Sequence, residues 1–218
     1  MTDATARAIA AEGIGSLILF ATVVGSGVMA QRLAGGNDAV ALLGNTAATG
    51  AVLFVLITLL GPISGAHFNP AVTVLLGPRD RWLSFVAAQL LGGILGVLIV
   101  HAMFDMPLIE QGSKIRTGMG QWIGEFVATF GLLFTIVLGS RQRPDAVSAL
   151  AALWIVAGYW FTASTSFANP AITIARALTD SFAGIRPIDA VGFIIAQSLG
   201  AWAGVQVAKW LAPLAPPR

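Results

Sequence analysis

The tripeptide Asn-Pro-Ala occurs twice in this sequence, one hundred residues apart, as Asn69, Pro70, Ala71 and as Asn169, Pro170, Ala171. The match continues beyond the tripeptide, since Thr73 pairs with Thr173 in the same register. Asparagine is a strong N-cap and proline fits the first helical position, so each copy predicts a turn that opens a helix. An asparagine that caps a helix through its amide oxygen keeps an NH₂ group for other hydrogen bonds. Such a pair of groups is suited to binding a neutral, hydroxylated solute.

The composition is that of an integral membrane protein. Of the 218 residues, 56% are apolar and 10% are charged, whereas a soluble domain carries roughly 25% charged residues. The 12 basic and 10 acidic residues are scattered, which argues against nucleic acid as a partner. The absence of cysteine excludes disulfides, thiolate metal sites and cysteine nucleophiles. No nucleotide-binding loop, metal-ligand spacing or Ser-His-Asp arrangement is found, so we expect no cofactor, no metal and no enzymatic activity.

Six apolar segments are long enough to cross a bilayer, which takes ~17–25 residues of helix. They cover residues 8–29, 39–60, 82–104, 118–139, 145–163 and 189–211. The first exceeds the ~7–15 residues of a signal-peptide core, so we interpret it as a retained helix. The predicted fold class is an all-α membrane protein with one channel domain over residues 1–218.

Each Asn-Pro-Ala is followed by an apolar segment that is too short to cross a bilayer. The first runs from Asn69 to Gly77, and the second runs from Asn169 to about Leu178. Ten residues of helix reach ~15 Å, which is half of a ~30 Å hydrocarbon core. These segments therefore predict two re-entrant half-helices, which are tolerated at that depth only where they are buried in protein or line a wet cavity.

The two halves of the chain resemble each other. The stretch "SFVAAQLLGGILG" in residues 1–113 matches "GFIIAQSLGAWAG" in residues 114–218. Each half has three spans, an odd number, so the second half is inverted in the membrane relative to the first. Glycines spaced four apart within these stretches predict close helix crossings. Basic residues, Arg218 among them, are more frequent on the side of the termini, which predicts that both termini are cytoplasmic.

This inverted 3+3 repeat explains why the tripeptide occurs twice. The two half-helices meet N-terminus to N-terminus at the centre of the membrane and together cross it. Each helix start carries about half a positive charge. The paired site therefore hydrogen-bonds neutral solutes and repels cations.

The sequence resembles the major intrinsic protein family, the aquaporins and aquaglyceroporins. The resemblance rests on the "SGAHFNPAVT" loop, the second Asn-Pro-Ala, a Glu near the start of spans one and four, and "AQ-x-x-G" in spans three and six. It implies six tilted helices with two half-helices, and a homotetramer with one pore per subunit in the lipid bilayer. The form "NPAITIAR" is similar to a bacterial branch associated with arsenic resistance, which implies a bacterial inner (plasma) membrane.

The resemblance also implies the positions of a selectivity filter. Water-selective members carry Arg directly after the second Asn-Pro-Ala, where this sequence has Ile172. Counting along the family pattern places the other filter residues at Thr49, at Ala157 or Gly158, and at Ser166. None of these is aromatic or charged, so we expect a filter that is wider and less polar than one for water alone.

Four further residues have alternative interpretations. Glu12 and Glu125 are intramembrane carboxylates, which either brace the re-entrant loops, as the resemblance implies, or relay protons. His67 either lines the pore, as the matching residue does in the family, or packs in the interior. Arg176 either caps the end of its half-helix, where a cation is favoured, or lines a vestibule.

The predicted function is a passive channel for small neutral solutes, either a metalloid (arsenite or methylated arsenic) or a polyol, with some water. One alternative is a water-selective aquaporin with an unusual filter. A second is a secondary carrier, because broken helices in an inverted repeat also describe transporters. A third is an assembly or adhesion protein with a vestigial pore. A carrier driven by an ion gradient needs ionisable groups at the midplane; only Glu12 and Glu125 qualify, and both lie near the starts of their spans.

Overall fold

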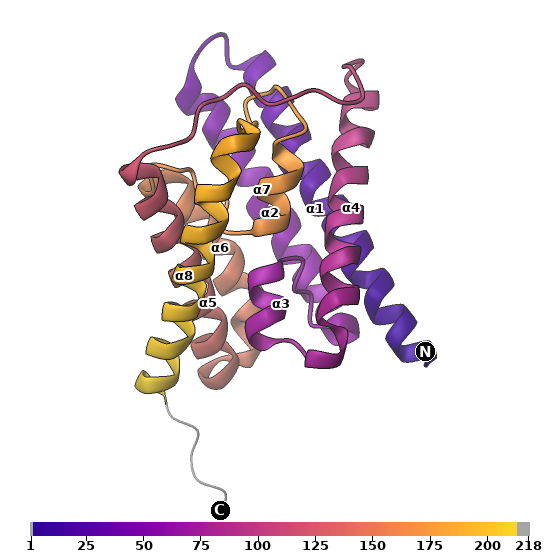
Figure 1. Ribbon diagram of the computed structural model, residues 1–218, viewed down its shortest axis with the longest axis vertical. Helices are drawn as coiled ribbons and strands as arrows, with labels where there is room; N and C mark the ends of the chain where they lie inside the picture. Colours follow the sequence, from indigo (N-terminus) through magenta and orange to yellow (C-terminus); the bar gives the residue numbers. More distant parts are fainter. Residues whose placement is uncertain (1, 213–218) are drawn as a thin grey trace, which may run out of the picture.

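Helices make up the regular structure of this computed structural model, which describes residues 2–212 (Figure 1). Within that range the α-helices are α1 (Asp3–Leu33), α2 (Asp38–Ser64), α3 (Pro70–Leu76), α4 (Trp82–Met103), α5 (Met119–Gln142), α6 (Val147–Phe161), α7 (Pro170–Arg176) and α8 (Pro187–Leu211). Two short 3₁₀ turns, Arg79–Arg81 and Pro144–Ala146, lead into α4 and α6. The fold is all-α, as predicted.

Six of these helices are long and apolar enough to cross a membrane, namely α1, α2, α4, α5, α6 and α8. They coincide with the six predicted spans, although α1 extends beyond residues 8–29 at both ends. Its polar start is stabilised by a cap, because the hydroxyl of Thr2 accepts a hydrogen bond from the backbone N–H of Thr5 at 3.3 Å. Apolar length therefore locates the spans but not the ends of the helices.

The two half-helices, α3 and α7, have seven residues each. This length corresponds to ~10 Å of helix, so neither can cross the hydrocarbon core alone. In Figure 1, α7 lies above α3 near the middle of the bundle, and the two helices contact each other. Both end slightly earlier than predicted; α3 stops at Leu76 because Gly77 adopts extended backbone.

The long helices pack in two matching pairs, α1 with α4 and α5 with α8, and α2 packs against α6 across the two halves. Gly92 and Gly96 of α4 lie against the backbone of α1, and Gly200 and Gly204 of α8 lie against the backbone of α5. A Cβ added at any of these four glycines would collide with a main-chain carbonyl oxygen. The predicted close helix crossings are therefore confirmed.

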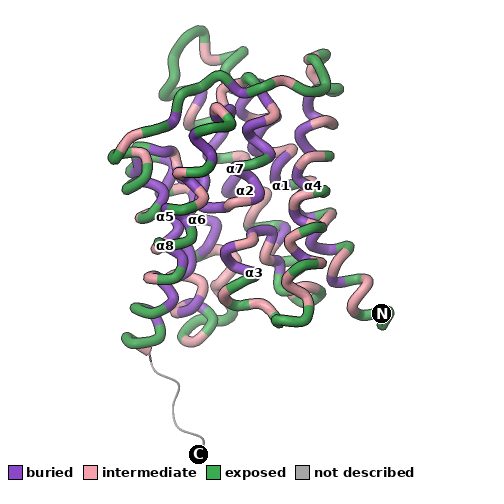
Figure 2. Tube along the Cα trace, in the orientation of Figure 1, coloured by how far each residue is buried: buried purple, intermediate pink, exposed green. Residues whose placement is uncertain are grey.

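Burial follows the inner faces of the helices, while their outer faces are exposed (Figure 2). The exposed faces are apolar, with Leu91, Leu153, Ile195 and Trp202 each more than half exposed. A soluble protein rarely presents such large continuous apolar surfaces to water. This outer surface is therefore suited to contact with lipid.

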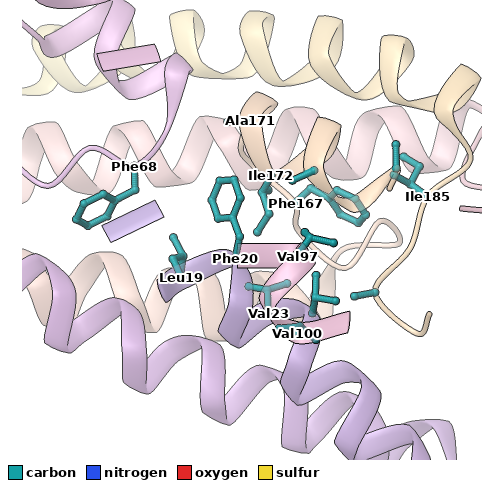
Figure 3. Packing of buried hydrophobic residues seen from close by; sticks show 14 of the residues in the cluster. Leu19, Phe20, Val23, Phe68, Val97, Val100, Phe167, Ala171, Ile172 and Ile185 are labelled. Atoms are coloured by element: carbon teal, nitrogen blue, oxygen red, sulfur yellow. The ribbon is translucent and has the colours of Figure 1, made fainter. Parts of the chain in front are cut away.

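A buried cluster fills the space between α1, α4 and α7. Figure 3 shows Phe20 of α1 and Val97 of α4 beside Ile172 of α7. Phe68 and Phe167, from the loops before the half-helices, belong to the same cluster. The loops are thus anchored by apolar packing as well as by polar contacts.

The two ends of the bundle differ in how they are covered. α1 begins and α8 ends at the lower end in Figure 1, and the connection between α4 and α5 crosses the upper end. This connection, residues 104–118, is called the strap below. Which membrane face each end occupies stays a prediction, and Arg218, which contributed to the charge bias, lies outside the described residues.

We expect Gly200→Ala to destabilise the protein, because the added Cβ collides with the carbonyl oxygen of Phe126. Overpacking of this kind costs about 1–3 kcal/mol. Gly120→Ala is the matched control, since no atom lies within 4 Å of a Cβ added at Gly120. Melting temperatures of the detergent-solubilised variants measure the effect. Equal melting temperatures would contradict the close packing of α5 with α8.

Candidate functional site

The two half-helices begin at the paired asparagines. Asn69 and Asn169 both have extended backbone, with φ of −153° and −159°. The Oδ1 of Asn69 accepts a hydrogen bond from the N–H of Ala71 at 2.9 Å, and the Oδ1 of Asn169 accepts one from Ala171 at 2.9 Å. Each asparagine therefore caps the helix that follows it.

The asparagine amides also join the two halves of the chain. The Nδ2 of Asn69 donates to the carbonyl oxygen of Ala168 at 2.8 Å. The Nδ2 of Asn169 donates to the carbonyl oxygen of Phe68 at 2.8 Å. The sequence suggested that both NH₂ groups are free to face a pore. Instead, each uses one hydrogen to bind the opposite loop, which leaves one hydrogen per amide for a solute.

The loops that precede the half-helices have left-handed backbone at matching positions. Ala66 and Phe68 have φ of 50° and 47°, and Ser166 and Ala168 have φ of 51° and 49°. This conformation costs roughly 1–2 kcal/mol for each residue with a Cβ, so it persists only where the surroundings enforce it. None of the four is Gly or Asn, the residues that usually signal such backbone in a sequence.

Glu12 of α1 holds the first loop in this shape. Its buried carboxylate accepts hydrogen bonds from the backbone N–H groups of His67 at 2.9 Å and Phe68 at 2.7 Å. The hydroxyl of Ser64 and the Nε2 of Gln89 each donate to it at 2.7 Å. A carboxylate with four donors around it is suited to bracing the loop.

Glu125 of α5 plays the same part for the second loop. It is fully buried and accepts hydrogen bonds from the N–H groups of Phe167 at 2.8 Å and Ala168 at 2.9 Å. The Nε2 of Gln197 donates to Glu125 at 2.5 Å and to the hydroxyl of Thr173 at 2.9 Å. Glu125 thereby links α5, α8 and the start of α7.

A cavity of ≈ 270 Å³ runs along both half-helices. Its wall is largely aliphatic and comes from α1, α2, α5 and α6 together with the two loops. The polar side chains on the wall are Thr49, His67, Asn69, Ser140, Tyr159, Ser166, Asn169 and Arg176. A passage with a few fixed polar groups in an apolar wall suits neutral solutes that exchange water for protein hydrogen bonds.

His67 lines the cavity and also packs inside the protein. Its Nδ1 lies 3.2 Å from the hydroxyl oxygen of Thr73, and its ring meets that of Phe85 edge-on at 5.8 Å. The two sequence interpretations of this residue are therefore compatible.

No group of three or more His, Cys, Asp or Glu side chains that could hold a metal ion occurs in residues 2–212.

The structure brings three of the predicted filter residues to the cavity wall, namely Thr49, Ser166 and Ile172. Ala157 is exposed on the outer face of α6 and does not reach the cavity. Gly158 is buried against Ser166, where an added Cβ would lie 2.7 Å from the Ser166 hydroxyl oxygen. The filter position on α6 therefore needs to be corrected.

The contribution of α6 comes instead from Tyr159, which sequence reasoning missed. Its hydroxyl donates to the Thr49 hydroxyl oxygen at 3.5 Å and faces the cavity. Neighbouring side chains on a helix point ~100° apart. A predicted position that is wrong by one residue can therefore select a side chain that faces lipid instead of one that faces the cavity. Tyr159, Phe167 and Arg176 therefore add aromatic and charged groups to the wall beside the predicted filter residues.

Arg176 ends α7 and lines the cavity near the strap. It is 2% exposed, and its Nε donates to the carbonyl oxygen of Ala183. Its guanidinium carbon lies 3.3 Å from the centre of the Phe167 ring. The vestibule interpretation is thus closer to the structure than a simple helix cap.

The strap brings a second arginine to the same place. Arg116 is 6% exposed, and its side chain donates to the carbonyl oxygens of Gly184 at 2.9 Å and Ser164 at 3.2 Å. Its guanidinium carbon lies 5.0 Å from the centre of the Phe167 ring. Burial lowers the pKa of Arg116 to about 10, so it remains protonated at neutral pH. The sequence placed this residue in a loop and gave no reason to expect it beside the cavity.

The strap is fixed by His101, which is buried near the end of α4. Its Nδ1 lies 3.0 Å from the carbonyl oxygen of Leu108 in the strap, and its Nε2 lies 2.8 Å from the hydroxyl oxygen of Thr179. The backbone of Gly112 also donates to the carbonyl oxygen of Ala177 at 3.0 Å. The strap and the loop between α7 and α8 therefore form one cover over this end of the cavity.

Comparison with known proteins agrees with this architecture. The family model described as Major intrinsic protein matches residues 1–165. Aquaglyceroporin AqpS of Rhizobium meliloti (strain 1021) is 50% identical over 214 residues, which cover 96% of this chain and 91% of that protein. The probable aquaporin AqpM of Archaeoglobus fulgidus is 30% identical over 246 residues, covering 96% of this chain and 100% of the relative.

A solved structure has the same fold. The aquaglyceroporin from Plasmodium falciparum superposes with a TM-score of 0.72 at 19% sequence identity. The match covers 96% of this chain and 98% of the other. At this identity the likeness supports the arrangement of the helices alone.

We expect Glu125→Gln to weaken the centre of the protein. The amide would present an NH₂ group to donors that now face a carboxylate oxygen, and losing one such bond costs about 1.5–3 kcal/mol. The melting temperature and the solute flux per folded protein should both fall. Asp105→Asn is the matched control, since Asp105 is an exposed strap carboxylate with no ion pair among residues 2–212. Wild-type flux and melting in Glu125→Gln would show that the loop does not depend on this carboxylate.

Proposed function

The chain belongs to the major intrinsic protein family, and from this premise we propose that its solute is a compact molecule with several hydroxyl groups, either arsenous acid or glycerol, carried with modest water flux. Membership makes the protein a passive membrane channel for small neutral solutes and not an enzyme. The choice of solute rests on the cavity wall.

Ile172 is the observation that carries the proposal. It is 5% exposed and lies on the cavity wall directly after the second Asn-Pro-Ala. An arginine there would supply fixed donors and a permanent charge, whereas isoleucine supplies neither and is shorter. The next cation along α7, Arg176, is held toward Ala183 and Phe167 and does not take over that position.

The surrounding wall is polar on one side and apolar on the other. The hydroxyls of Thr49 and Tyr159 provide hydrogen bonds, and Ile172 and Phe167 provide apolar surface. A compact polyhydroxylated solute has the same two-sided character. Arsenous acid is uncharged at neutral pH and enters without charge compensation, whereas ionised arsenate would meet a large desolvation cost in the apolar stretch.

A relative supports the same class of solute. The protein from Rhizobium meliloti, which is half identical in sequence over nearly the whole chain, is named an aquaglyceroporin. A polyol or metalloid is therefore favoured over water alone.

The assembly and orientation form part of the proposal. The strap faces the outside of a bacterial inner membrane, and both termini face the cytoplasm, in keeping with the excess of basic residues at that end. Residues 1–113 and 114–218 act as two inverted repeats that share one cavity. The exposed apolar faces of the long helices pair in a homotetramer with a cavity in each subunit.

Stopped-flow measurements in proteoliposomes test this function with water, glycerol, urea and arsenite. We expect glycerol and arsenite flux that rises linearly with concentration and ignores a pH gradient. Saturation at low concentration with proton coupling would favour the carrier. Fast water flux that excludes both solutes would favour the water-selective alternative, and no flux at all would favour the vestigial pore.

Ile172→Arg should narrow the wall and add a charge, so glycerol and arsenite flux should fall about tenfold or more while water flux falls less. Ile172→Val is the matched control, because it keeps an apolar side chain and should retain wild-type solute flux. Both are measured in the same proteoliposome assay, normalised to folded protein. Equal solute flux in Ile172→Arg and wild type would show that this residue does not limit passage.

A further inference from the structure

Three cations gather beneath and beside the strap without a carboxylate partner. None of Lys114, Arg116 and Arg176 takes part in an ion pair among residues 2–212. Two of them face one aromatic ring, with the guanidinium carbons of Arg176 and Arg116 at 3.3 Å and 5.0 Å from the centre of Phe167. Buried charges are normally paired, whereas here the carboxylate of Glu125 acts on both arginines from beyond ion-pair distance, so this end of the cavity is positively charged.

The two arginines differ in the donors that they have left. Arg116 is largely used within the protein, where its side chain donates to Gly184, Ser164 and Thr165. Arg176 donates through Nε to Ala183, and its two Nη atoms have no acceptor among residues 2–212. They are not sealed off, because Arg176 lies on the wall of the cavity. Arg176 therefore offers a donor fork, and Arg116 adds to the positive field around it.

A second polar group at the same end lacks a partner. Ser166 is 2% exposed and lines the cavity, and its hydroxyl oxygen has no hydrogen-bond partner among residues 2–212. A buried hydroxyl without a partner costs about 1–3 kcal/mol. The oxygen itself is covered, so the donors at this end that a ligand in the cavity can reach are those of Arg176.

We propose that the strap end of the cavity binds a small monovalent oxyanion, such as formate or nitrate, and that the bound anion blocks the flux of neutral solutes. Two oxygens of such an anion match the planar donor fork of a guanidinium, which forms strong charge-assisted hydrogen bonds. The nearby cations raise the local concentration of anions. A monovalent anion matches the single donor fork of Arg176, since the Nε and Nη1 of Arg116 already donate within the protein.

The anion stays at this end because the cavity beyond it is mostly aliphatic. Leu19, Leu53, Leu132 and Ile155 belong to that wall. Moving an anion into such surroundings without a paired cation is unfavourable. The anion therefore occupies the mouth that a neutral solute must pass.

Formate and formamide provide a matched pair of probes, because they are similar in size and only formate is charged. Calorimetric titration of the detergent-solubilised full chain should show binding of sodium formate and none of formamide at the same concentration. Formate should also lower glycerol flux in proteoliposomes. Because the titration does not require transport, it remains informative if the proposed solute is wrong.

Arg176→Gln should weaken formate binding about tenfold, since it removes the charged donor fork. Arg32→Gln is the matched control: Arg32 also lies over a phenylalanine ring, at 5.0 Å from Phe104, but it is exposed and away from the cavity. It should bind formate as the wild type does. If Arg176→Gln does not elute as folded protein, Arg176→Lys replaces it and should bind more weakly than wild type, because lysine lacks the fork.

Binding of formate that is equal in the Arg176 variant and the wild type would overturn the proposal. The proposal would also be wrong if formamide bound as well as formate, or if Arg32→Gln weakened formate binding as much as Arg176→Gln does. If formate binds but does not lower glycerol flux, the proposed inhibition of flux is wrong and the proposed binding site stands.

Lys114 gives the site a pH dependence. Partial burial and the fields of Arg116 and Arg176 lower its pKa to about 8, and Asp38 acts in the opposite direction. Its Nζ donates to the carbonyl oxygen of Phe182 at 3.3 Å. Because a lysine loses its charge above its pKa, formate binding should weaken between pH 7 and pH 9, which bracket this value. Lys114→Gln should remove most of that change, and an unchanged pH profile in this variant would exclude Lys114 from the site.

Discussion

Two buried carboxylates keep the backbone at the membrane centre in a shape that it would not otherwise adopt. The loops before the half-helices contain left-handed residues, and the N–H groups of His67, Phe68, Phe167 and Ala168 have no helical partner. In lipid an unsatisfied backbone group costs several kcal/mol. Glu12 and Glu125 accept these hydrogens, each with a glutamine that extends the contact to a neighbouring helix. The direction of both half-helices, and with it the cavity, depends on these bonds.

The distribution of charge along the cavity follows from where the chain can support it. The centre carries amide groups, whose hydrogens are shared between the opposite loop and the passage. The two buried arginines beside the cavity lie toward the strap, where backbone carbonyls of Gly184, Ser164 and Ala183 receive guanidinium hydrogens. Carbonyls of an irregular loop can do this because no helix has already used them. The strap therefore supplies electrostatics that the helices alone could not hold.

Much of the fold could be predicted from the sequence, because apolar length, the repeated tripeptide and the glycine spacing each have a direct physical meaning. The site was predicted in part. Asn69, Asn169 and Ile172 are marked by the tripeptide itself, but Tyr159 depends on helix register, which an apolar helix with no polar stripe does not reveal. Arg116 depends on how a fifteen-residue connection, residues 104–118, folds back over the bundle. The left-handed backbone of the loops could not be predicted from the local sequence either, since Glu12 and Glu125 impose this conformation from other helices.

The two hydrogen bonds between the asparagines and the opposite loops also constrain how the chain is made. Asn69 and the carbonyl that its amide binds, on Ala168, are 99 residues apart. When the first half leaves the ribosome, Glu12 is already present to brace its re-entrant loop. The carbonyl of Ala168, which the Asn69 amide binds in the folded protein, has not yet been made. An unpaired amide in lipid disfavours stable insertion of that loop. We therefore expect the re-entrant loop of the first half to insert stably only after the second half has been made. Until then the first half should stay near the translocation machinery or at the membrane–water interface.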